Sequence, residues 1–332
     1  MQDSQLDVLN GCLTCLKKGE QVSLVSVVKT WGTSPRPVGS LLAISSSGLF
    51  FGSVSGGCVE EDLIEQLTAQ PAKHPQLLIY GETEEQRHHF GLPCGGALQL
   101  IAEPLNDIDE VNQLVINIEN RKAVIRSTHL TEHSVSVSAW SQQNPLLTES
   151  TWQNVFGPTW RLMIIGAGET GRFLAEIAEG LGYEILVSDP RPDYRKNWPL
   201  KSIPLLDGFP DDIINGLKID SRTAIVAVSH DPKVDDMALL AALNSQAFYV
   251  GALGSKLNNQ QRRERLVEHF GFTEAQVSQL HGPVGLNIGS KTPAEIALSI
   301  LAEITAIKNG IQPSKALEKK SEQSSATEVC KL

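Results

Sequence analysis

The fold of the second half of the chain is decided by the stretch LMIIGAGETG at residues 162–171. Apolar residues typical of a strand lead directly into a complete GxGxxG motif, whose glycines are Gly166, Gly168 and Gly171. In a dinucleotide-binding fold these glycines permit a tight turn, the approach of backbone N–H groups to a pyrophosphate, and close packing of the following helix on the strand. Asp189 ends the next predicted strand, where a carboxylate can accept hydrogen bonds from a ribose diol. The stretch therefore predicts a Rossmann-type domain.

Strands and helices alternate regularly beyond this motif. The predicted elements are strands at 162–165, 184–188, 224–228 and 248–252, and helices at 171–181 and 235–243. This alternation is typical of a parallel sheet, because the crossover between parallel strands is long enough to hold a helix. We therefore expect the α/β class, with a doubly wound parallel sheet in the C-terminal domain.

The first half of the chain predicts a smaller α/β domain at the N-terminus. Leucines at helical spacing predict a helix over residues 6–16, in which Cys12 and Cys15 are expected to be buried. A β-branched run predicts a strand at 22–28. The expected divisions are an N-terminal domain at 1–105, an extension and linker at 106–160, the Rossmann-type domain at 161–311 and a disordered polar tail at 312–332.

Composition narrows the class of protein. The chain has 332 residues, 41% of them hydrophobic and 20% charged, and a net charge of −10, which argues against a broad nucleic-acid surface. The short basic cluster of Arg262, Arg263 and Arg265 is typical of a solvated helix face. No apolar run approaches the ~20 residues that span a bilayer. Because residues 1–5 also lack the pattern of a signal peptide, we expect a cytoplasmic protein with no nucleic-acid or membrane partner.

Five cysteines in a chain without a predicted leader indicate free thiols, and two of them belong to glycine loops. Cys58 directly precedes a predicted helix, whose N-terminal dipole favours a thiolate, and Cys94 lies in a second loop that could converge on the same pocket. A structural role as a small or packed turn residue stays open for both. The loop before Cys58 predicts a phosphate site made by the backbone N–H groups of Ser53, Ser55, Gly56 and Gly57.

Two histidines are candidates for acid–base chemistry. His230 follows a predicted strand and His281 begins the segment HGPVG, so both could lie at the carboxyl edge of the sheet. An NAD(P)-dependent oxidoreductase would use one of them beside a bound nicotinamide. The sequence identifies no partner for either ring, so a role in stabilising a loop stays equally open, as does NAD(P) binding itself.

Ordered motifs in both halves of the chain are similar to those of a known family. These motifs are Gly52–Glu60, Gly91–Gly96, Gly166–Gly171, Ser229–Asp231, Tyr249–Lys256, His281–Gly289 and Lys291–Ala297. On these residues the chain resembles the XdhC/CoxI family of accessory proteins for molybdenum hydroxylases such as xanthine dehydrogenase. It departs from many members at Glu169-Thr170, where they have His-Val, and at Asn287, where they have Asp.

The resemblance implies a maturation chaperone rather than an enzyme. Similar proteins bind the molybdenum cofactor (molybdopterin), hold it while a cysteine desulfurase supplies its terminal sulfur, and pass it to the apo-hydroxylase. Cys58, in contact with molybdenum, and Cys94 would then handle the cofactor or its sulfur. The glycine motif with Asp189 would bind a nucleotide or the pterin phosphate. A homodimer is expected of the family, and a scaffold that links desulfurase to hydroxylase without binding small molecules stays open as an alternative.

Overall fold

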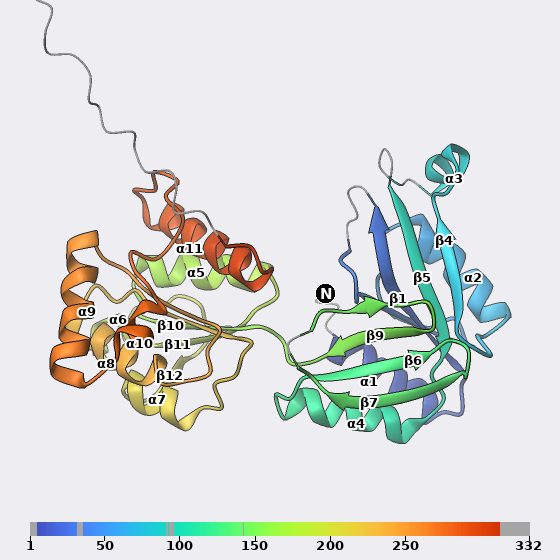
Figure 1. Ribbon diagram of the computed structural model, residues 1–332, viewed down its shortest axis with the longest axis horizontal. Helices are drawn as coiled ribbons and strands as arrows, with labels where there is room; N and C mark the ends of the chain where they lie inside the picture. The colour runs from blue at the N-terminus through green and yellow to red at the C-terminus, as the bar shows by residue number, and fades with distance from the viewer. Residues whose placement is uncertain (1–4, 32–35, 91, 93–95, 142, 313–332) are drawn as a thin grey trace, which may run out of the picture. The chain divides into compact units, whose positions relative to one another are not determined.

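The computed structural model describes residues 5–31, 36–90, 92, 96–141 and 143–312 (Figure 1). The chain divides into two compact units, which are unit 1 at Met1–Thr159 and unit 2 at Trp160–Leu332. Cys94 and all but the first residue of the predicted tail lie outside the described residues. Within the described part, no helix is both long enough and apolar enough to cross a membrane.

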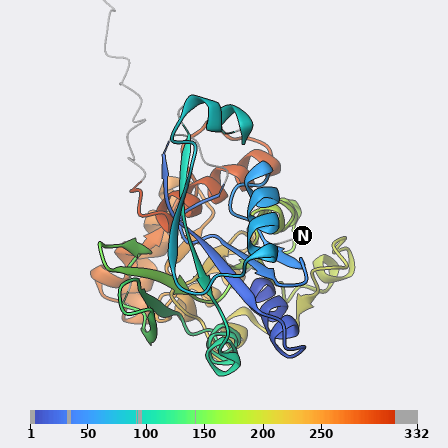
Figure 2. The same ribbon diagram turned by 90° about the vertical axis from the view of Figure 1, so that its right-hand side faces the viewer.

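Unit 1 is built on an antiparallel sheet of five strands in the order β3-β2-β1-β5-β4. Its elements are α1 (Gln5–Leu16), β1 (Val22–Trp31), β2 (Leu41–Ser45), β3 (Phe50–Gly52), α2 (Cys58–Ala69), β4 (Gln76–Tyr80), α3 (Glu84–His89), β5 (Ala97–Pro104) and α4 (Ile108–Glu119). Successive side chains of a strand point to opposite faces, so Leu24 packs with α1 and α4 while Val25 packs with α2. Helices α3 and α4 lie at opposite ends of the unit in both views (Figures 1 and 2).

Residues 106–159, expected to be an extension of the first domain followed by a linker, belong to unit 1. After α4 they form a second antiparallel sheet in the order β7-β6-β9-β8. Its strands are β6 (Val124–His129), β7 (Ser134–Ala139), β8 (Leu146–Leu147) and β9 (Thr151–Phe156). The side-chain amide of Gln5 donates to the Val155 carbonyl at 2.8 Å and accepts from the Gly157 N–H at 3.1 Å. The end of this stretch is therefore bonded directly to α1.

Unit 2 confirms the predicted Rossmann-type fold, because its six strands are all parallel in the order β12-β11-β10-β13-β14-β15. Helices α5 and α11 cover one face of the sheet, and α8 and α9 contribute to the core on the other. The elements are β10 (Arg161–Ile165), α5 (Glu169–Gly180), β11 (Glu184–Ser188), α6 (Pro192–Lys196), β12 (Leu205–Leu206), α7 (Pro210–Gly216), β13 (Thr223–Ala227), α8 (Pro232–Ala242), β14 (Tyr249–Ala252), α9 (Lys256–Phe270), α10 (Glu274–Ser278), β15 (Leu280–His281) and α11 (Pro293–Lys308).

The strand order of unit 2 reverses between β10 and β13. In open parallel sheets ligands bind outside the carboxyl ends of the strands at such a point. Gly166 and Ser229 follow these two strands, and their backbones approach so closely that a Cβ on Gly166 would lie 2.6 Å from the Ser229 Cα. The fold therefore places the glycine motif at the position where a Rossmann-type sheet binds its ligand.

Candidate functional site

The glycine loop of unit 1 is organised around the carboxylate of Glu60. Backbone N–H groups of residues 54–57 donate to this carboxylate at 2.7–2.9 Å. The hydroxyls of Ser53 and Ser55 donate to it as well. Glu60 is the third residue of α2, from which its side chain reaches back to the residue before the helix. The loop therefore contains a built-in anion.

This arrangement corrects the predicted phosphate site at Ser53, Ser55, Gly56 and Gly57. Burial alone would raise the pKa of Glu60, but hydrogen bonds from the Ser55 hydroxyl and from backbone N–H groups outweigh it and lower the pKa to about 2. Glu60 is therefore a carboxylate at neutral pH. A phosphate placed on the same donors would meet a negative charge already bound there.

Cys58 is the first residue of α2 and is exposed. The contacts of Glu60 hold the loop that precedes it, and the Arg36 guanidinium donates to the Ser53 hydroxyl at 3.2 Å on the same loop. Cysteine sulfur is a soft metal ligand. The exposed sulfur of Cys58 therefore suits a soft metal such as molybdenum. The N–H groups of the loop do not suit the phosphate of the pterin, because they already bind Glu60.

The other described cysteines are structural. Cys12 and Cys15 lie buried in α1, as expected. Burial, reinforced by the neighbouring Cys15, raises the pKa of the Cys12 thiol to about 12. Such a thiol is neither ionised at neutral pH nor accessible, so it is unsuited to sulfur chemistry. The predicted role of Cys94 falls outside the described residues.

The first and last glycines of the motif in unit 2 have a geometry that other residues would strain. Gly166 has a φ of +119°, and a Cβ on Gly171 would lie 2.0 Å from the Gly166 carbonyl oxygen. Glu169 occupies the first turn of α5, where its charge would oppose an anion, but its carboxylate turns to Arg172 at 2.9 Å and its side chain is 67% exposed. The Glu169 carboxylate is therefore paired with a guanidinium on its own helix.

Because of the close approach at Gly171, we expect alanine substitutions at two glycines of α5, Gly171 and Gly180, to change the free energy of unfolding in opposite directions. We expect Gly171→Ala to lower the free energy of unfolding by about 2 kcal/mol, because the added methyl group collides with backbone. Gly180→Ala meets open space in the same helix and should raise it by about 0.5–1 kcal/mol. Urea unfolding of the full chain measures both. Equal effects of the two substitutions would contradict the packing described here.

Asp189 lies at the end of β11 but does not present its carboxylate to solvent. It is fully buried and accepts bonds from the Ala167 N–H at 2.8 Å and from the Arg191 guanidinium at 2.9 and 2.7 Å. Arg191 also bonds the Ser229 carbonyl at 3.1 Å and lies over the ring of Tyr194. Burial raises the pKa of Asp189, yet these bonds outweigh it and lower the value. Binding of a ribose diol by Asp189 stays a prediction, and it requires Arg191 to move.

His281 has a partner that the sequence did not reveal. Its Nδ1 lies 3.2 Å from the Glu303 carboxylate on α11, and its ring stacks on Tyr249 at 4.4 Å. The same carboxylate accepts from the Tyr249 hydroxyl at 2.6 Å and from the Gly285 N–H at 2.7 Å. Burial would raise the pKa of Glu303, but these bonds lower it. Nδ1 is thus engaged, and Nε2 is the nitrogen available to a ligand.

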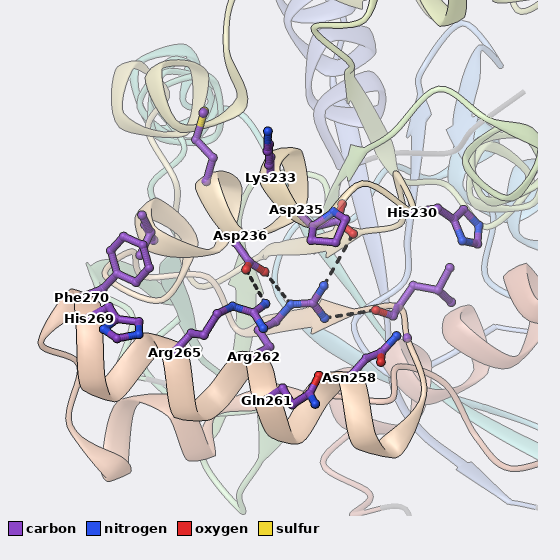
Figure 3. A pocket seen from close by; sticks show the side chains of 15 residues that line it. His230, Lys233, Asp235, Asp236, Asn258, Gln261, Arg262, Arg265, His269 and Phe270 are labelled. Atoms are coloured by element: carbon purple, nitrogen blue, oxygen red, sulfur yellow. Dashed lines mark hydrogen bonds and ion pairs between the residues drawn. The ribbon is translucent and has the colours of Figure 1, made fainter.

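His230 has a left-handed backbone, with a φ of 61°, and lines a groove between α8 and α9 (Figure 3). Ion pairs join the two helices in this groove. Arg262 bonds Asp236 at 2.7 Å and lies 3.8 Å from Asp235, and Arg265 bonds Asp236 at 2.6 Å. Only 5% of Arg262 is exposed, so the expectation of a solvated basic face is wrong for this residue. The sequence shows the basic cluster but not that Asp236, on the other helix, pairs with it.

Comparisons with known proteins match each of the two units to a family model with XdhC in its description. The family model described as "XdhC Rossmann domain" matches residues 162–304, and that described as "XdhC and CoxI family" matches residues 15–81. Together the two matches span the core of unit 2 and most of the first sheet of unit 1. The chain belongs to the XdhC/CoxI family.

Relatives in the XdhC/CoxI group match over nearly the whole chain. Molybdenum cofactor insertion chaperone PaoD of Escherichia coli strain K12 is 27% identical over 315 residues, which cover 93% of this chain and 90% of PaoD. A probable subunit of xanthine dehydrogenase from Bacillus subtilis strain 168 is 28% identical over 319 residues, covering 87% of this chain and 94% of that protein. A crystal structure from Bacillus halodurans described as a xanthine dehydrogenase superposes with a TM-score of 0.68 over 94% of this chain and 98% of that one. At 22% identity this last match shows a shared fold.

Three residues that hold the candidate sites in place were not predicted from the sequence. They are Glu60, Arg191 and Glu303. A signal was present for Glu60, since an acid at the third position of a helix often bonds the residue before it. Arg191 is likewise near its partner in the chain, and its bond to Asp189 is a local contact. Glu303 meets His281 only through the packing of α11, so no local pattern predicts that pair.

Proposed function

We propose that this protein binds the molybdenum cofactor and inserts it into an apo molybdenum hydroxylase, with Cys58 contacting the metal. The observation that carries the proposal is the exposed Cys58 at the start of α2, behind a loop that Glu60 holds in place. The relationship to PaoD, a chaperone for insertion of this cofactor, supports the same conclusion.

Cys58 is the exposed thiol among the described cysteines of unit 1. When bound, the cofactor supplies a molybdenum centre that accepts soft sulfur ligands. A pre-positioned cysteine sulfur binds such a centre without first ordering a flexible loop, which lowers the entropic cost of binding. Because Cys58 is exposed, it can also release the cofactor to a partner.

Two finer roles belong to the same proposal. A cysteine desulfurase would supply the terminal sulfur while the cofactor is held on the chaperone, and the apo-hydroxylase would then receive the product. We also propose that the chaperone works as a homodimer in the cytoplasm. A monomeric mass by light scattering, for the protein with and without cofactor, would contradict the dimer without affecting cofactor binding.

The decisive experiment measures pterin and molybdenum in protein isolated from a cofactor-producing host. We expect near-stoichiometric molybdenum in wild type and at least a tenfold loss in Cys58→Ser, because a hydroxyl is a poor ligand for a soft metal. Cys94→Ser tests the second glycine loop, and Cys330→Ser serves as a control that also removes one thiol. Full molybdenum content in Cys58→Ser would contradict the assigned role of this residue.

The alternative function is an NAD(P)-dependent oxidoreductase that uses unit 2. The Rossmann-type sheet and the glycine motif at the reversal of its strand order favour it. Tight NAD(H) binding with turnover, retained in Cys58→Ser and combined with absence of pterin from wild type, would establish this alternative and exclude the chaperone. No molybdenum, pterin or nucleotide bound to any sample would instead support a scaffold.

A further inference from the structure

The groove between α8 and α9 is a second candidate binding site of unit 2. Its volume is about 850 Å³, which lies in the range of roughly 300–1,000 Å³ typical of small-molecule sites. His230 lies at one end and Phe270 at the other, with the ion pairs of Arg262 and Arg265 between them (Figure 3). Neither the glycine motif nor Cys58 is among the described residues that line it. The groove therefore adjoins the glycine motif only through the turn at Ser229 and His230.

The lining of the groove favours an anionic ligand. Its carboxylates are Asp235 and Asp236, and both are engaged by arginine, so neither presents an uncompensated negative charge. Lys233 is exposed on the rim, and among the described residues its ammonium has no carboxylate partner. In a chain with a net charge of −10, this surplus of positive charge is a local feature of the groove.

Uncharged groups in the groove indicate what the ligand carries besides its charge. Met237 and Leu253 provide apolar surface against which a flat ring can pack. Asn258 and Gln261 provide amides, each with both hydrogen-bond donors and an acceptor, which suits the edge of a nitrogen heterocycle. We propose that this groove binds a phosphorylated nitrogen heterocycle, with its ring against the apolar side chains and its phosphate near Lys233.

The backbone at His230 supports this assignment independently of the side chains. A left-handed conformation is unfavourable for an L-residue other than glycine, and such residues are concentrated at binding and catalytic sites. The strained turn at His230 directly follows β13 and precedes α8, so it holds the end of the groove at the carboxyl edge of the sheet. This is the edge at which parallel sheets bind ligands.

Two kinds of ligand have this chemistry. One is a nucleotide, and the other is the pterin of the molybdenum cofactor. The nucleotide source is independent of the proposed function, whereas the pterin source rests on it. The test therefore has two arms on the full chain. One titrates AMP, GMP and CMP by calorimetry, with ribose 5-phosphate as the probe that lacks a ring. The other measures pterin in protein isolated from a cofactor-producing host.

The informative variant is Lys233→Glu, and Lys256→Glu is its matched control. Both lysines are exposed in the first turn of a helix, where glutamate is well tolerated, but only Lys233 lines the groove. We expect Lys233→Glu to weaken one nucleotide, or to lower pterin content, by about tenfold, since a charged hydrogen bond is replaced by repulsion. Lys256→Glu should stay within about twofold of wild type in both arms.

Each outcome bears on the groove in a defined way. Nucleotide affinity that falls only in Lys233→Glu, with no pterin in wild type, supports the groove and contradicts the chaperone. Pterin that falls only in Lys233→Glu supports both. Equal losses in the two lysine variants, binding of ribose 5-phosphate as strong as that of the nucleotides, or no response of either arm to Lys233→Glu would overturn the proposal. His230→Asn, which tolerates the same backbone, should also weaken the ligand.

Discussion

Glu60→Ala should lower the free energy of unfolding by about 3 kcal/mol, because it removes an acceptor shared by several donors. Four backbone N–H groups and two hydroxyls lose their common partner, and part of the loop that they belong to is buried. Glu61→Ala on the same helix is the control, since that side chain is exposed and should leave stability near that of wild type. Urea unfolding of the full chain measures the difference.

The same carboxylate predicts a dependence of stability on pH. Its pKa is about 2 in the folded chain and near 4.5 in the unfolded chain, so its contribution is fully present above pH 4.5. The contribution, about 3 kcal/mol, is lost as pH falls through about 2. Glu60→Gln should therefore show a weaker loss of stability between pH 4.5 and 2 than wild type. Parallel profiles for the two proteins would contradict the assigned bonding.

Arg126→Met should be the most destabilising of these substitutions, at about 4 kcal/mol, because it leaves a buried carboxylate without its counter-ion. Arg126 is 2% exposed, bonds Glu103 at 2.8 Å and Glu110 at 2.5 Å, and thereby joins both sheets of unit 1 to α4. Glu103 is fully buried and also accepts from the Thr128 hydroxyl at 2.9 Å. Water cannot replace the guanidinium at that position.

A double variant separates the charge from the packing. Arg126→Met with Glu103→Leu should recover more than half of the loss, since two apolar side chains can replace a buried ion pair. Arg172→Met removes a more exposed guanidinium from pairs with Glu169 and Glu176 on one helix, and it should change little. A double variant no more stable than Arg126→Met would show that shape, rather than charge, makes Arg126 indispensable.

The Rossmann-type half was predictable because its signals are local. The glycine motif follows its strand and opens its helix, and β10, α5 and β11 lie close to their predicted bounds. In the second sheet of unit 1 the valines of β7 alternate with serines, which favours a strand, but the two-residue strand β8 is too short to show a period. How these strands pair depends on contacts between distant residues, which no local pattern specifies.

The positions of the candidate site residues could be predicted from the sequence, but most of the hydrogen bonds around them could not. The sequence located Cys58 at a helix start and Asp189 at a strand end, and both are there. It did not reveal that Glu60 occupies the donors of the first loop or that Arg191 covers Asp189. Side chains within a few residues of a polar group compete with its intended ligand, and only three-dimensional geometry decides which one binds.

The attachment of α11 to α5 has a consequence for the order in which the two units form during synthesis. Ile300 and Ile304 of α11 share a core with Leu174 of α5, so unit 2 lacks part of its interior until α11 has left the ribosome. Unit 1 needs only the segment up to Gly157, which bonds Gln5 near the start. Because domains generally fold as they emerge, the half that carries Cys58 should be complete while the Rossmann-type half is still being translated.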